Sequence, residues 1–393
     1  MGIFSERKIV DYVICGLLGL VAVNFLHYGQ FILPLICLIL FIDNKFRFNF
    51  GDIRIFILLC LFGISFFAFS YKLGFYAVMG FCLPMGYYIG VNIKDPSQDN
   101  IKKVLYIIAL GMCIHVILNG IYDMYMHINK VNFLSSNHYD FWTRDRMSST
   151  ATALNLDILI GMLYYIIRYE KNKVLKYSSI IGFAIAIAYC IFAGRRTPLL
   201  LIAICLFVSF VYEGFIKNIL TEKQKKLFIG LFIAGVLVVL GVAVSYETDF
   251  LGCQAFFNKF YIIYKFRQGL LDNSRINAYI SAVKLMPSHP WGCQEISGIT
   301  GIQVHDLWVD IYDYAGVVSW GLMLVYTTYY FFMFIKVMKL KNVDDSIKVM
   351  LLTVFVCIVL QMFLEPVMTG SSIFAIICVI IGAIEERMIT HEQ

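Results

Sequence analysis

The sequence predicts an all-α, polytopic membrane protein, and its composition and hydropathy pattern both predict it. Of its 393 residues, 60% are hydrophobic and 15% are charged, whereas a soluble domain carries about 45–50% apolar and about 25% charged residues. Apolar stretches recur along the whole chain, and its length accommodates about twelve spans of about 20 residues. This composition excludes an ordinary soluble globule, a disordered chain and a secreted disulfide scaffold.

Twelve apolar stretches are predicted to form the membrane-spanning helices. They lie near residues 9–26, 28–42, 53–71, 73–93, 104–126, 151–169, 177–193, 198–219, 227–245, 314–338, 349–364 and 373–386. The second stretch is short, so a tilted or re-entrant segment is an alternative to a full span there. The chain then divides into helices 1–9 with short loops (1–245), one long loop with short helices (246–313) and helices 10–12 (314–393).

Lys and Arg residues in short loops predict the orientation. With the N-terminus in the cytoplasm, 21 of the 32 Lys and Arg residues fall on the cytoplasmic side and 11 on the opposite side. Both termini are therefore predicted inside, and the loop 246–313 outside. A nucleic-acid partner is not expected, because the basic residues lie in short loops and form no continuous patch.

Two adjacent arginines, Arg195 and Arg196, occupy a tight turn between two apolar helices on the predicted outer side. Gly194 permits a sharp exit from one helix, and Pro198 suits the first turn of the next. Two guanidiniums beside a helix N-terminus favour an anion site. The alternative is a pair of arginines that anchor the helix ends by snorkelling to the interface.

The long loop is predicted to contain two helices. Residues 256–271 mix aromatic and basic side chains, which indicates a helix lying in the membrane interface. A second helix follows from Asn273 or Ser274 to about Met286. Arg275 in its first turn opposes the helix dipole, and an anionic ligand there would remove the conflict.

Two cysteines of this loop, Cys253 and Cys293, could pair in an oxidising compartment. The other predicted loop, 127–150, contributes His138, Trp142, Arg144 and Arg146. Aromatic and cationic side chains together suit a sugar or a phosphate. The alternative for the second loop is a solvated segment with interfacial aromatics.

His305 and Asp306 open the tenth predicted span, and Asp306, Asp310 and Asp313 form one acidic stripe at helical spacing. The stripe could indicate a metal site, but adjacent turns of one helix rarely close a metal cage. Carboxylates favoured by the positive end of the helix dipole are the preferred interpretation. No metal and no cofactor are therefore expected.

These residues, in this order, resemble the bacterial O-antigen polymerase and O-antigen ligase family of polytopic glycosyltransferases. The turn Ala193-Gly194-Arg195-Arg196-Thr197 is similar to the family's Ser-x-Ser-Arg-Thr motif, with Arg196 at the position of the family's arginine. Ser274-Arg275 and the turn His289-Pro290-Trp291-Gly292 are similar to motifs of its long outer loop. His305-Asp306, followed by Gly316 and Gly321, resembles its His-Asn pair and spaced glycines, with Asp in place of Asn. Arg146 resembles an earlier arginine of the family.

The resemblance implies a C-type glycosyltransferase fold in the bacterial cytoplasmic membrane, with an undecaprenyl-diphosphate-linked glycan as donor and acceptor. Arg196 and Arg275 would hold the leaving diphosphate, since an Arg–phosphate pair is bidentate. His305 would deprotonate the acceptor hydroxyl. The residues expected to bind substrate are Arg195, Arg144, Arg146, Asp306 and Trp291.

The activity expected on this basis is polymerisation of O-antigen or capsule repeat units at the outer face, with a flippase and a chain-length regulator as further partners. A ligase that moves the same donor to a lipid core or a protein is the close alternative. A twelve-span flippase or transporter is a different class, for which Asp11, Asp157 and His115 are the candidate charges within spans. A non-catalytic scaffold for envelope assembly is a third class.

Overall fold

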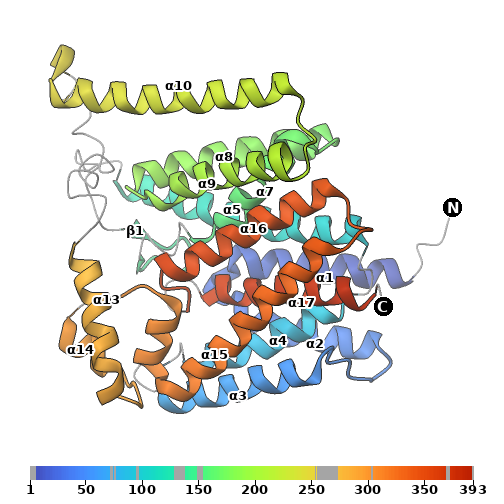
Figure 1. The fold of residues 1–393 in the computed structure, drawn as a ribbon. Helices are drawn as coiled ribbons and strands as arrows, with labels where there is room; N and C mark the ends of the chain where they lie inside the picture. The colour runs from blue at the N-terminus through green and yellow to red at the C-terminus, as the bar shows by residue number, and fades with distance from the viewer. Residues whose placement is uncertain are drawn as a thin grey trace.

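The computed structural model describes residues 6–70, 74, 77–93, 97–127, 138–147, 154–252, 254, 273–301, 304–368 and 372–391. Within these residues the chain is almost entirely α-helical, and its one sheet is a two-stranded hairpin. The prediction of an all-α chain is confirmed. Figure 1 shows the long helices running side by side across the molecule.

The long helices follow the predicted apolar stretches. Their bounds are α1 Glu6–Val23, α2 Ile32–Asp43, α3 Ile53–Phe69, α4 Met79–Val91, α5 Gln98–His127, α7 Asp157–Arg168, α8 Lys173–Phe192, α9 Thr197–Val211, α10 Glu222–Glu247, α15 Leu307–Lys339, α16 Asp345–Leu364 and α17 Ser372–Thr390. The short elements are η1 Phe25–His27, η2 Gly29–Phe31, β1 His138–Tyr139, β2 Arg146–Met147, η4 Tyr212–Ile216, η5 Phe250–Gly252, α13 Asn273–Leu285, η6 Met286–Ser288 and α14 Glu295–Thr300.

The bundle has two distinct ends. Both chain termini lie at one end, which we call the terminal end (Figure 1). The hairpin β1–β2, the turn 193–197 between α8 and α9, and the segment 273–306 lie at the opposite end, which we call the loop end. The first helix therefore begins, and the last helix ends, at the same end of the bundle.

Close helix packing builds the core. The most extensive contacts join α4 to α17, α7 to α16, α1 to α5, and α3 to both α4 and α15. Glycines permit two of these approaches, because a Cβ added at Gly90 would lie 2.6 Å from the carbonyl oxygen of Ile380 and one at Gly161 would lie 2.6 Å from Cα of Val354. Small residues that let backbones approach are typical of helix packing in membranes.

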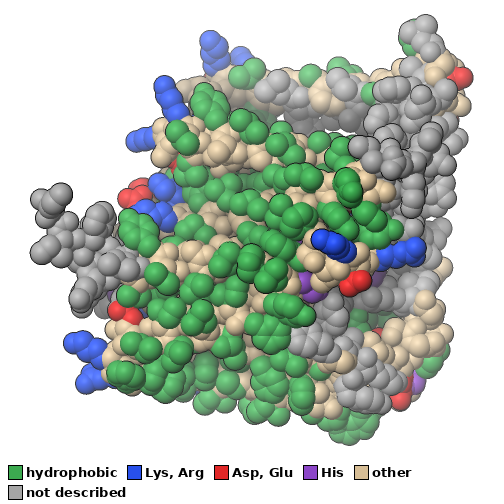
Figure 2. All heavy atoms as spheres, turned by 180° about the vertical axis from the view of Figure 1, so that it is seen from behind, with side chains coloured by type: hydrophobic (Ala, Val, Ile, Leu, Met, Phe, Trp, Pro, Cys, Tyr) green, Lys and Arg blue, Asp and Glu red, His purple; other side chains and the backbone are tan. Residues whose placement is uncertain are grey.

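One face of the bundle is largely apolar between its two ends. Figure 2 shows hydrophobic side chains covering the middle of the visible face, with most of the described Lys and Arg side chains at its edges. Six helices of the described chain are long and apolar enough to cross a membrane: α5, α8, α9 with η4, α10, α15 and α16. The chain thus has the helices of a membrane protein.

One helix boundary differs from the expectation. The helix predicted to begin near residue 314 begins at Leu307, because Asp306 caps its N-terminus by accepting from the backbone N–H groups of Trp308 (3.1 Å) and Val309 (3.0 Å). The predicted interfacial helix 256–271 lies outside the described residues. The second loop helix is confirmed as α13, which runs from Asn273 to Leu285.

Candidate functional site at the loop end

The turn between α8 and α9 places both predicted arginines at the loop end. Gly194 adopts φ +69°, and the N–H of Arg195 donates to the carbonyl of Cys190 at 2.8 Å. Arg196 is the N-cap residue of α9, and Pro198 lies in the first turn. Both arginine side chains are half-buried. Both arginines therefore belong to the turn that leads into a helix N-terminus, where the helix dipole favours an anion.

Glu365 connects this turn to the end of α16. Its buried carboxylate accepts from the hydroxyl of Thr197 at 3.0 Å, and Glu365 is itself the C-cap residue of α16. On α16, Phe363 packs against Trp308 in the first turn of α15, with ring centroids 4.7 Å apart. The end of α16 thus links the arginine turn to the start of α15, where His305 and Asp306 lie.

A buried polar network at the end of α5 was not predicted. Asp123, fully buried, accepts from Nδ1 of His138 (2.5 Å), from the hydroxyl of Tyr189 (2.9 Å) and from the N–H of Tyr139 (3.2 Å). The carboxylate therefore joins α5, the hairpin and α8. Its three donors satisfy a group that would otherwise be costly to bury.

The same network reaches the loop before α2. Asn119, one turn before Asp123, donates to His115 (2.9 Å) and accepts from the N–H of Phe141 (2.8 Å). On the hairpin, the Asp140 carboxylate lies 3.6 Å from Nδ1 of His27. Asp140 also accepts from two backbone N–H groups of its own turn.

The His27–Asp140 pair changes the titration of both groups. The Asp140 carboxylate, 3.6 Å away, raises the pKa of His27, and this exceeds the lowering that burial causes. Burial raises the pKa of Asp140, but the nearby His27 and hydrogen bonds from the backbone outweigh it and hold that pKa at about 2. When His27 is protonated, the pair therefore fastens the hairpin to the end of α1.

Tyr189 places the arginine turn next to this network. Its hydroxyl binds Asp123, and its ring lies 2.8 Å from the position of a Cβ at Gly120, so α5 and α8 touch there. The guanidinium of Arg195 interacts electrostatically with Tyr189 and with Cys190. The turn, α5 and the hairpin are therefore neighbours, although their residues are far apart in the sequence.

The hairpin arginines lie in solvent. Arg146 stands opposite Tyr139 in the antiparallel pair, and Arg144 adopts a positive φ of +63° in the connecting turn. Both side chains are exposed. The predicted loop thus becomes a hairpin that buries His138 and Asp140 and whose cations point away from the bundle core.

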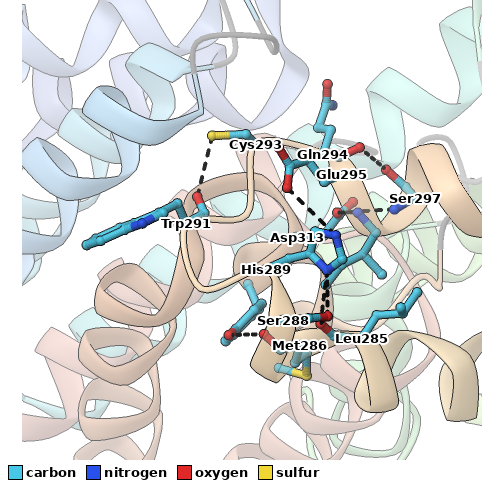
Figure 3. A network of polar contacts seen from close by, with 12 residues as sticks. Leu285, Met286, Ser288, His289, Trp291, Cys293, Gln294, Glu295, Ser297 and Asp313 are labelled. Atoms are coloured by element: carbon cyan, nitrogen blue, oxygen red, sulfur yellow. Dashed lines mark hydrogen bonds and ion pairs between the residues drawn. The ribbon is translucent and has the colours of Figure 1, made fainter.

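The segment after α13 folds as a turn held by α15 (Figure 3). The Asp313 carboxylate accepts from the N–H groups of Ile296 (3.0 Å) and Ser297 (3.2 Å), and the Asp313 carbonyl accepts from the N–H of Gln294 (2.7 Å). The hydroxyl of Tyr312 donates to the carbonyl of Met286 at 2.5 Å. Nδ1 of His289 lies within hydrogen-bond distance of the hydroxyl of Ser288 and of the carbonyl of Leu285.

Two glycines let this turn enter a kink in α15. Gly316 adopts φ +73° and ψ −173° inside the helix, and the N–H of Val317 donates to the carbonyl of Pro290 at 2.8 Å. A Cβ at Gly292 would lie 2.4 Å from the carbonyl oxygen of Tyr312, and one at Gly316 would lie 2.5 Å from that of Pro290. The His-Pro-Trp-Gly turn therefore replaces a helical hydrogen bond of α15.

The three aspartates of the acidic stripe have separate surroundings. Asp306 caps α15, and burial raises the pKa of its carboxyl against the lowering effect of the two N–H donors. Asp313 binds the turn at 294–297, and Asp310 is buried within α15. Among the described residues no group of three or more His, Cys, Asp or Glu side chains could hold a metal ion.

Some of the remaining predicted site residues have described side chains and others do not. His305 is half-buried with φ +63°, directly before the cap Asp306, and Trp291 is exposed and stacks on Phe69 with centroids 5.4 Å apart. Arg275 belongs to the first turn of α13, but its side chain lies outside the described residues, as does Cys253. Cys293 is a free cysteine whose thiol donates to the carbonyl of Phe69 at 3.6 Å.

Sequence reasoning missed Asp123, Asn119 and the pair His27–Asp140. Asp123 falls inside the predicted helix 104–126, and a carboxylate within an apolar span is the signal that could have found it. The pair could not be found from spacing, since its two members are 113 residues apart. Neither a family model nor a curated protein matches the chain.

Proposed function

We propose that the protein is a glycan polymerase of the bacterial cytoplasmic membrane, with twelve spans and both termini in the cytoplasm. It would join undecaprenyl-diphosphate-linked repeat units of O-antigen, capsule or a related polysaccharide at the outer face. The observation that carries this proposal is the arginine turn, because Arg196 occupies the N-cap position of α9 at the loop end of the bundle. The phosphates of a lipid diphosphate lie at the membrane boundary, where such a turn can bind them.

In the proposed reaction, the acceptor hydroxyl attacks the anomeric carbon of the donor sugar. The bond between this carbon and the diphosphate oxygen breaks, and undecaprenyl diphosphate leaves with the electron pair. Arg196 and Arg275 would stabilise its growing charge. His305 would take the proton of the hydroxyl, with Asp306 beside it. The contact between Phe363 and Trp308 supports this division of roles, since it joins the two regions through one helix end.

Substrate binding is proposed for the neighbouring residues. Arg195 lies in the same turn, and Arg144 and Arg146 lie exposed on the hairpin that packs against α5 and α8. The exposed indole of Trp291 offers an apolar face for a sugar ring. A flippase and a chain-length regulator are the further partners proposed.

Reconstitution of the purified protein with a lipid-linked repeat unit tests the proposal. We expect the glycan to lengthen, and we expect Arg196→Ala to lower the rate by about 10²–10³, as loss of a charge-stabilising donor does. Arg54→Ala is the matched control, because Arg54 is an exposed arginine that pairs with Asp52 at the terminal end. It should polymerise at the normal rate.

Three outcomes would overturn the proposal. Movement of the intact lipid across the bilayer without lengthening would indicate a transporter. Transfer of the glycan to a lipid core or a protein would indicate a ligase. Neither reaction, with normal folding and normal binding of both substrates, would indicate a scaffold.

A further inference from the structure

A charged pocket opens at the terminal end, far from the arginine turn. It has a volume of about 440 Å³ and lies between the end of α15, the start of α16 and the residue that follows η4. We propose that this pocket, the lysine pocket, binds the phosphate of an anionic phospholipid headgroup. Its charged lining residues are Lys217, Lys339, Lys341, Lys348, Asp344 and Asp345.

The charges of the lysine pocket are unbalanced, since four lysines face two aspartates. Lys217 is paired with Asp345 at 2.7 Å, and the buried Lys348 donates to the carbonyl of Leu340. Lys339 and Lys341 are exposed and make no hydrogen bond or ion pair within the part of the chain that the structure describes. Their two ammonium groups are thus available to an anion at the rim of the pocket.

A general preference for cations at this place does not account for the whole arrangement. Lys339 ends α15 and suits the negative end of its dipole, but Lys341 lies beyond the helix. Lysines on the inner side of a membrane also fix the orientation of a membrane protein, but lysines with that role do not have to line a pocket. A basic pocket between helix ends is the kind of site at which anionic headgroups bind.

Apolar side chains beside the pocket favour a lipid over a soluble anion. Phe215 and Ile216, which precede Lys217, are 65% and 67% exposed, and Ile219 is 44% exposed. These residues flank Lys217 in the sequence, so exposed apolar side chains adjoin one lysine of the pocket. Such a pairing suits an amphiphile, whose acyl chains lie on the apolar residues while its phosphate meets the lysines.

The test measures the melting temperature of the full-length protein in neutral detergent during titration with dioctanoyl phosphatidylglycerol. Lipid that binds only the folded state raises the melting temperature. Lys339→Gln combined with Lys341→Gln should weaken the apparent affinity by about 30-fold, since each lysine near a lipid surface contributes about a five-fold attraction. The matched control is Lys223→Gln with Lys226→Gln, which removes two exposed lysines of α10.

We expect the control variant to bind this lipid as the parent protein does, and we expect dioctanoyl phosphatidylcholine to stabilise far less. Equal weakening in both double variants would mean diffuse attraction to surface charge and would overturn the site. Equal stabilisation by inorganic phosphate would mean a soluble anion instead of a lipid. Equal stabilisation by phosphatidylcholine would show that the excess positive charge of the pocket does not select the lipid, and would overturn the proposal.

Discussion

Carboxylates make side-chain and backbone contacts at both ends of the bundle. At the terminal end several of them pair with Lys or Arg, as in Asp99–Lys102 (3.3 Å), Asp345–Lys217 (2.7 Å) and Glu213–Arg168 (3.2 Å), and Glu386 accepts from the hydroxyl of Tyr87 (2.7 Å) and from the N–H of Asp52 (3.0 Å). At the loop end they accept from His, Tyr and Thr side chains and from backbone N–H groups, as Asp123 and Glu365 do. The clear difference lies between two residues of α5, Asp99 at the terminal end and Asp123 at the loop end.

Asp99 and Asp123 differ in the sequence distance that their interactions span. Asp99 and Lys102 are three residues apart on one helix, and such a pair stabilises a helix only slightly. Asp123 binds residues 15, 16 and 66 positions away, on a hairpin and on another helix. The interactions of Asp123 thus depend on tertiary structure, and their removal should cost more than removal of the Asp99–Lys102 pair.

The two aspartates of α5 give the most direct test and the largest expected effect. Asp123→Ala leaves three buried donors without an acceptor, so we expect it to lower the free energy of unfolding by about 3–5 kcal/mol. Asp99→Ala is the matched control on the same helix, because its side chain is 83% exposed. It should change stability by less than about 0.5 kcal/mol. Thermal unfolding in detergent measures both, and equal losses would contradict the comparison.

The sequence predicts the helices for a physical reason. Hydropathy is a property of single residues, so it predicts where the helices lie without any knowledge of contacts. The bend at Gly194 and the helix start at Pro198 are equally local, and the structure confirms both. Local sequence patterns therefore predicted the position of the arginine turn.

The loop end required contacts that no local pattern contains. Asp313 looks like one member of an acidic stripe, yet it binds residues 296 and 297. Gly292 and Gly316 are ordinary glycines in sequence, and only their contact explains why neither can carry a Cβ. Residues of the candidate site could be named from the sequence, but their partners could not.

Those two glycines provide the next test, with a smaller expected effect. Gly292→Ala introduces a Cβ against backbone atoms at φ +72°, and we expect it to destabilise the turn by about 2–3 kcal/mol. Cys293 reports on the turn, because its half-buried thiol donates to the carbonyl of Phe69. Labelling of Cys293 by a thiol reagent, followed by mass spectrometry, should become several-fold faster.

Gly298→Ala is the matched control for this turn, since a Cβ there meets no atom within 4 Å. Cys293 in the Gly298→Ala variant should be labelled at the same rate as Cys293 in the parent protein. Faster labelling in both variants would mean that any added side chain loosens the segment. The effect of Gly292→Ala would then not be due to the close approach of this turn to α15.

The smallest expected effect concerns pH and the hairpin. Asp140 raises the pKa of His27 above its ordinary value of 6.5. A histidine whose pKa is raised by folding stabilises the folded state fully below its unfolded pKa, and this contribution is lost as the pH rises through the raised pKa. Because Asp140 has a pKa of about 2, it stays ionised throughout that range. His27 is 39% exposed, so we expect less than about 1 kcal/mol.

The measurement compares the melting temperatures of the parent protein and of His27→Gln at pH 6 and at pH 9. Glutamine can hydrogen-bond to Asp140 but carries no charge at either pH, so other titrating groups cancel in the difference. The parent protein should be the more stable at pH 6, and the difference should shrink at pH 9 as the imidazolium loses its proton. A difference that stays constant would show that His27 holds Asp140 by packing alone.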